Sequence, residues 1–99
     1  MADYKDVLRE KAGKLRAILA RYGDKINDDK MTYLKNLVNN TFEITNGRLD
    51  ALDYSVREEG IRNYHHKLDE AITELLAIFE PKGLENYQSF EENRSDNGR

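Results

Sequence analysis

The chain has 99 residues, of which 35% are charged and 38% hydrophobic, and its formal net charge is −3 at pH 7. A chain of this length supports one domain with a modest core, burying roughly 60–65% of the surface that the unfolded chain exposes. The sequence contains no cysteine, which excludes disulfides, a thiolate nucleophile and a cysteine-based zinc site. Its apolar runs are short and its first residues are polar, so we expect a cytoplasmic protein with no membrane segment and no secretion signal.

The first predicted helix covers about residues 4–22. Asp3 is suited to cap its start, and Gly23 is suited to end it. Apolar side chains recur within it every three or four residues, which places them on one helical face. They are Tyr4, Leu8, Ala12, Leu15, Ile18, Leu19 and Tyr22.

A second helix is predicted over about residues 31–58, with Asp28 or Asp29 as its cap. From Val38 onward its apolar positions alternate in steps of four and three residues, as in a coiled-coil seam. Asn46-Gly47 lies inside this stretch and is a common turn signal, so two shorter helices are the alternative. Because the stripe keeps its phase across the glycine, we predict one long helix. Its stripe consists of Met31, Leu34, Val38, Phe42, Thr45, Leu49, Leu52 and Val56.

A third helix is predicted over about residues 61–79. Its apolar stripe would lie opposite the preceding one if a straight helix ran through Gly60 at 100° per residue. We therefore predict a turn at Gly60, with a continuous helix as the alternative, and Pro81 ends the helix. The stripe consists of Ile61, Tyr64, Leu68, Ala71, Ile72, Leu75 and Phe79.

The predicted fold class is all-α, either a three-helix bundle or a helical hairpin with a long central helix. Residues 1–80 form the helical domain, and residues 81–99 are predicted to be a mostly disordered acidic tail. Within that tail, Leu84, Tyr87 and Phe90 are spaced by three residues. They are the side chains suited to form a short docked turn.

Two adjacent histidines, His65 and His66, precede Asp69 and Glu70 at the i,i+4 spacing of a helix. Such pairs can share a metal ion or raise the pKa of a histidine. One histidine–carboxylate pair is two ligands short of a structural zinc site, and phosphoryl acceptance is the other histidine chemistry to consider. We interpret both residues as surface histidines in ordinary salt bridges, and we expect no cofactor and no metal.

The first predicted helix is basic, whereas the remainder of the chain is acidic. A nucleic-acid-binding protein would use Arg9 and Arg16 of such a helix against phosphates. However, the sequence shows no helix-turn-helix signature and no interleaved aromatic side chains. We predict instead that the basic borders pair with acidic borders of the other helices, within or between subunits. Lys5, Arg9 and Arg16 line one border, and Lys11, Lys14 and Arg21 line the other.

No phosphate-binding loop, nucleotide fingerprint or catalytic triad signature is present, so we expect no enzymatic activity. The predicted function is a small protein–protein interaction module, an adaptor, regulator or inhibitor, that presents helix faces to a partner protein. We expect a homodimer formed through the second helix's stripe. The alternatives are a nucleic-acid-binding regulator and a histidine-centred phosphotransfer or metal-binding protein. The candidate interaction residues are Tyr54, His65, His66, Arg9 and Arg16.

Overall fold

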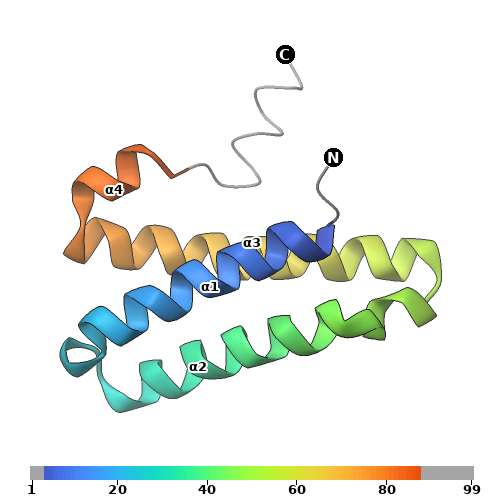
Figure 1. Ribbon diagram of the computed structural model, residues 1–99, viewed down its shortest axis with the longest axis horizontal. Coiled ribbons are helices and arrows are strands. Elements are labelled where there is room, and N and C mark those ends of the chain that lie inside the picture. Colours follow the sequence, from blue (N-terminus) through green and yellow to red (C-terminus); the bar gives the residue numbers. More distant parts are fainter. Residues whose placement is uncertain (1–3, 88–99) are drawn as a thin grey trace.

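The computed structural model describes residues 4–87, and this part of the chain is all-α (Figure 1). Its long helices are α1 (Tyr4–Tyr22), α2 (Asp28–Glu43) and α3 (Tyr54–Phe79), and a short helix α4 (Pro81–Glu85) follows α3. Helix α1 packs against both α2 and α3 and crosses α3 obliquely (Figure 1). The predicted three-helix bundle is therefore confirmed.

The core lies where α1 faces the other two long helices. The stripe predicted on α1 is confirmed, since Leu8, Ala12 and Leu15 are completely buried. Each fully buried leucine or isoleucine stabilises the fold by about 1.5–3 kcal/mol relative to an exposed one. The apolar partners supplied by α2 and α3 that are at most 2% exposed are Leu34, Leu68, Ile72, Leu75 and Leu76.

Helix α2 begins three residues earlier than predicted, and its cap is Asn27. The Asn27 side chain accepts a hydrogen bond of 2.8 Å from the backbone N–H of Lys30. Asp28 and Asp29, predicted as caps, lie instead in the first turn. Their carboxylates are favourable there because the N-terminus of a helix carries a partial positive charge.

The predicted long helix over residues 31–58 is wrong, because the chain turns after α2. The last turn widens over Ile44–Arg48, and Gly47 adopts a φ of 100°, in the left-handed region that favours glycine. A 3-10 turn over Leu49–Ala51 and an extended Leu52 then lead into α3. The Asn46-Gly47 turn signal therefore prevails over the phase of the apolar stripe.

The predicted turn at Gly60 is also wrong, because α3 continues through it without interruption. The turn was inferred from two opposed apolar stripes on one helix, but most of the earlier stripe belongs to α2 and the turn after it, and only its Val56 lies in α3. Tyr54 and Val56, which precede Gly60 in α3, are 69% and 51% exposed. Only the face that begins at Ile61 packs into the bundle, so no change of direction is needed.

Helix α4 replaces the first part of the predicted disordered tail. Pro81 occupies its first turn, where its missing N–H costs no hydrogen bond. Leu84 and Tyr87 pack against the core, which confirms a docked turn for these two residues. Phe90 and the rest of the predicted tail, residues 88–99, lie outside the described residues. No helix in the described range is long and apolar enough to cross a membrane.

Candidate interaction face

The two basic borders of α1 face different neighbours. On the α3 side, Nζ of Lys11 lies 2.8 Å from Oδ1 of Asp69. Nη1 of Arg21 lies 2.6 Å from Oε2 of Glu80, the residue that joins α3 to α4. The prediction that basic and acidic borders pair is thus confirmed on this side, within one chain.

The pair of Lys11 and Asp69 belongs to a buried polar cluster with His65 and Tyr87. Nζ of Lys11 lies 3.0 Å from Nδ1 of His65, and since an ammonium group only donates, the ring proton is on Nε2. The Tyr87 hydroxyl donates to Oδ1 of Asp69. Burial first, and then the charge of Lys11, lower the pKa of His65 to about 4. Burial and the hydrogen bond to Asp69 raise the pKa of Tyr87.

The interpretation of two surface histidines is therefore wrong for His65, which is 4% exposed, whereas the surface position predicted for His66 is confirmed. The spacing Ile61–His65–Leu68–Ile72 follows the buried face of α3, and this signal in the sequence could have placed His65 inside. Among residues 4–87, no three His, Asp or Glu side chains are grouped so that they could hold a metal ion.

On the α2 side, two cations of α1 have structural partners near the turn after α2. Lys5 contacts Asp50 at 2.6 Å, and its hydrogen bond lowers the pKa of that carboxyl. Arg9 donates to the hydroxyl and carbonyl oxygens of Thr45, both at 3.0 Å, and to Oδ1 of Asn46 at 2.8 Å. Arg9 therefore binds acceptors in the turn Ile44–Arg48, which follows α2. Because these acceptors are uncharged, they do not neutralise the guanidinium.

Two further cations, Arg16 and Lys35, have no carboxylate partner among the described residues. The Arg16 guanidinium lies over the ring of Phe42, with Cζ 5.3 Å from the ring centroid. No Asp or Glu occurs three or four residues before or after Arg16 or Lys35, the positions from which a carboxylate on the same helix could pair with them. Both side chains are exposed, so this border of the bundle is positively charged.

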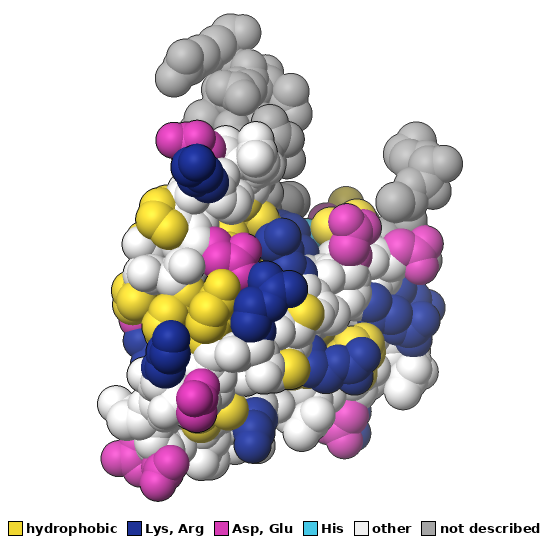
Figure 2. Space-filling view, turned by 60° about the vertical axis from the view of Figure 1, so that its left-hand side comes forward, with side chains coloured by type: hydrophobic (Ala, Val, Ile, Leu, Met, Phe, Trp, Pro, Cys, Tyr) yellow, Lys and Arg dark blue, Asp and Glu magenta, His cyan; other side chains and the backbone are white. Residues whose placement is uncertain are grey.

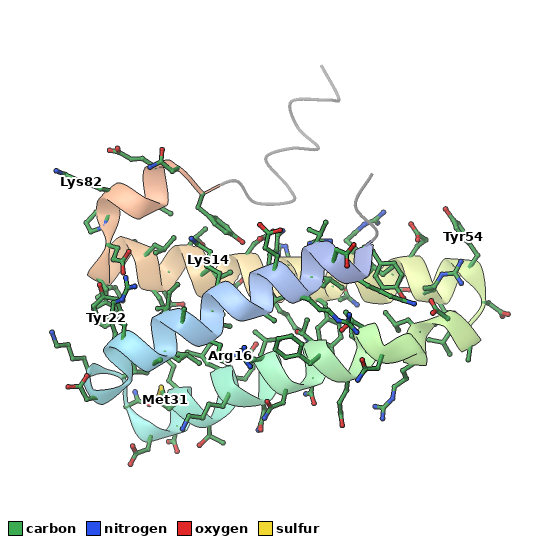
Figure 3. The ribbon with its side chains drawn as sticks, in the orientation of Figure 1. Lys14, Arg16, Tyr22, Met31, Tyr54 and Lys82 are labelled. Atoms are coloured by element: carbon green, nitrogen blue, oxygen red, sulfur yellow. The ribbon has the colours of Figure 1, made fainter. Side chains whose placement is uncertain are left out.

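Between α1 and α2 lies an open groove of about 390 Å³, within the size range of ligand pockets. Its floor is apolar, with Leu19 and Val38 buried and Met31 half-buried. Figure 3 shows Arg16 and Met31 between the two helices, and Figure 2 shows Lys and Arg side chains beside exposed apolar ones. The groove is lined by Arg16, Leu19, Ala20, Met31, Lys35, Val38 and Asn39. We call the groove and Arg9 together the α1–α2 face.

A second exposed feature is the end of the bundle where the chain enters α3. Leu52, Tyr54 and Val56 are 42%, 69% and 51% exposed there, and Tyr54 points away from the bundle (Figure 3). The predicted exposure of Tyr54 is thus confirmed. We call these three side chains the end surface.

The structure brings Arg9 and Arg16 to the same face but places Tyr54 elsewhere, at the end of the bundle. Lys35 was not predicted as a site residue. It follows Met31 by one helical turn and precedes Asn39 by another, so its position beside the apolar stripe could be found from the sequence. That Lys35 lies across the groove from Arg16 depends on how α1 and α2 pack.

Comparisons of the chain with protein-family models, with curated proteins and with solved structures find no match. Function must therefore be inferred from the chemistry of the surfaces themselves.

Proposed function

We propose that the protein is a small, non-enzymatic interaction module that binds a partner protein on its α1–α2 face. The observation that carries this proposal is an apolar groove bordered by two cations, Arg16 and Lys35, that no carboxylate neutralises within residues 4–87. Two cations on the opposite side of α1 are paired with carboxylates, in Lys11–Asp69 and Arg21–Glu80. An exposed apolar groove with charged borders is a common docking site for a peptide or helix.

The composition of the groove supports binding rather than catalysis. The described residues that line it include no carboxylate, imidazole or hydroxyl group, the groups most often used as general acids, bases or nucleophiles. The titratable residues His65 and Asp69 are buried and both contact Lys11 instead. They lie on the other side of α1 and do not line the groove.

Nucleic-acid binding is the second candidate, because the charges of Arg16 and Lys35 are available to phosphates. Three features favour a protein partner. The groove floor is apolar, no aromatic side chain from the described part of the chain lines the groove for base stacking, and Arg9 is engaged with Thr45 and Asn46.

We also propose self-association, through the end surface. The stripe expected to form the dimer is largely used inside the chain, since Val38, Thr45 and Leu49 are buried. Of this stripe, Leu52 and Val56 remain exposed, and they belong to the end surface together with Tyr54. Stable dimers bury about 800 Å² on each partner, more than three side chains offer, so this dimer is weak. Action in the cytoplasm remains a prediction.

Site-specific photo-crosslinking in the producing cells tests the proposed function. A photoreactive amino acid at Lys35 should capture a protein, whereas the same group at exposed Arg62 on α3 should not. Met31→Asp, which places a charge in the groove floor, should remove the adduct. Adducts with nucleic acid, or equal labelling from both positions, would contradict the proposal.

A further inference from the structure

We infer that the occupant of the groove is an acidic amphipathic helix of the partner protein. This inference rests on the proposed function and specifies the chemistry of the partner. It follows from three properties of the groove: the charge of its borders, the shape and composition of its floor, and the ordering of one of its cations.

The charge of the borders selects for an acidic partner. Arg16 stands on the α1 wall and Lys35 on the α2 wall, so an occupant between the helices passes two cations. Within residues 4–87, no carboxylate lines the groove. Acidic side chains on both edges of an occupant therefore gain attraction, whereas basic ones meet repulsion, and this complementarity sets partner choice and orientation.

The floor selects for a helix with an apolar stripe. Leu19 on α1 and Met31 and Val38 on α2 form an apolar strip between two neighbouring helices. An amphipathic helix binds such an apolar groove through its side chains at i, i+3, i+4 and i+7, which face the floor. Methionine suits this position, because its flexible thioether adjusts to different side chains.

Arg16 is already ordered for this contact. Its guanidinium lies over the Phe42 ring, which restricts its rotamers before any partner binds. A side chain ordered in advance loses less conformational entropy on binding, and a planar guanidinium can bind a carboxylate through two parallel hydrogen bonds. Lys35 supplies a second positive charge with less geometric demand.

Peptide binding to the complete chain tests this inference. The probe is a labelled helical peptide of about 18 residues, long enough to form a helix, with leucines along one face and glutamates on both edges. A matched peptide carries lysines in place of the glutamates, and a labelled DNA duplex serves as the third probe. Fluorescence anisotropy should show binding of the acidic peptide alone, weakening as salt rises.

Charge reversal locates the site. Arg16→Glu with Lys35→Glu should weaken binding of the acidic peptide by about tenfold or more, equivalent to about 1.4 kcal/mol. The matched control is Arg62→Glu on α3 with Lys82→Glu on α4, which changes the net charge equally at exposed positions on helices that do not line the groove. This control should change the affinity by less than about twofold, because distant exposed charges are screened.

The other outcomes separate the inference from the proposed function. Binding of the lysine peptide in the groove would overturn the inference but support a protein-binding groove. DNA binding that is lost on reversal of Arg16 and Lys35 would overturn both. If no peptide binds while the crosslink at Lys35 still captures a protein, the partner is not an acidic helix and the inference is wrong.

Discussion

Lys11 on α1 forms an ion pair with Asp69 on α3, with 2.8 Å between Nζ and Oδ1 and side-chain exposures of 12% and 8%. His65 contacts Lys11, and Tyr87 donates to Asp69, so the pair connects α1, α3 and the segment after α4. Removing one partner of such a pair leaves a buried charge, which costs more than the intact pair contributes relative to apolar residues.

Replacing Lys11 with methionine should therefore lower the free energy of unfolding by about 3–5 kcal/mol. The double variant Lys11→Met with Asp69→Leu should lose less than the two single variants together, because no charge is then left alone. Urea unfolding of the four proteins measures this coupling. Lys5→Met, at the more exposed pair with Asp50, should have a much smaller effect. Equal losses for Lys11 and Lys5 would contradict this.

His65 should make stability depend on pH between 6.5 and 4. In the unfolded chain its pKa is about 6.5, whereas in the fold burial and Lys11 lower its pKa to about 4. The unfolded state then binds the proton first, so stability is lost as the pH falls through this window and this residue causes no further loss below it. The loss amounts to about 3 kcal/mol.

The comparison uses His65→Asn, which offers an acceptor near the position of Nδ1, and His66→Asn as the exposed control. Unfolding free energies at several pH values should show a flatter profile for the His65 variant. The His66 variant should follow the parent. Parallel profiles for the parent and His65→Asn would show that His65 does not titrate as the structure implies.

Two glycines should respond to alanine with opposite signs. Gly47 has a φ of 100°, which an alanine adopts only at a cost of about 1–2 kcal/mol. Gly13 lies inside α1 with nothing within 4 Å of an added Cβ, so alanine should stabilise it by about 0.5–1 kcal/mol. Thermal unfolding resolves both effects, since 1 kcal/mol shifts the Tm of such a domain by about 4–8 °C. A stabilising Gly47→Ala would contradict the assigned turn.

Arg9 and Arg16 should differ in their effects on stability. Arg9→Ala removes three hydrogen bonds to Thr45 and Asn46, and should destabilise the fold by about 1.5–3 kcal/mol. Arg16→Ala removes a contact with the Phe42 ring, worth about 0.5–1 kcal/mol at an exposed site. Chemical denaturation tests the order of the two losses. A larger loss for Arg16→Ala would contradict a stabilising role of Arg9 at the turn after α2.

Self-association should depend on the end surface. Multi-angle light scattering over a range of concentrations should show a monomer that forms a dimer only at high concentration, because the apolar area is small. Tyr54→Ser with Val56→Ser should abolish the dimer and leave the fold intact, since both side chains are exposed. Ile78→Ser, at another exposed apolar position, is the control. A dimer that persists in the Tyr54 and Val56 variant would exclude the end surface.

The sequence predicts α1 well because periodicity, capping residues and a stopping glycine agree there. It misplaces the turn between α2 and α3 because two local signals conflict at Asn46-Gly47. The apolar phase favours continuity, whereas the left-handed conformation of Gly47 ends the helix. Tertiary contacts decide where the helix ends, because Arg9 and Lys5 of α1 bind the turn directly. Such contacts cannot be predicted from the local spacing of residues.

The candidate site shows the same division. Periodicity places Arg9 and Arg16 on one border of α1, and the structure confirms that border. The sequence does not show that Lys35 faces Arg16 across a groove, or that Lys11 lies against His65, because both relationships depend on how helices pack. Arg16 and Lys35 are 19 residues apart along the chain, and Lys11 and His65 are 54 residues apart.

Methyl NMR of methionine tests the central claim most directly. The chain contains two methionines, Met1 and Met31, and Met31 lines the groove. On titration of methyl-labelled protein with the acidic amphipathic peptide, the Met31 methyl signal should shift in a saturable way, and the Arg16→Glu, Lys35→Glu variant should lose this response. A Met31 signal that stays unchanged while the peptide binds would place the binding site elsewhere and contradict the account.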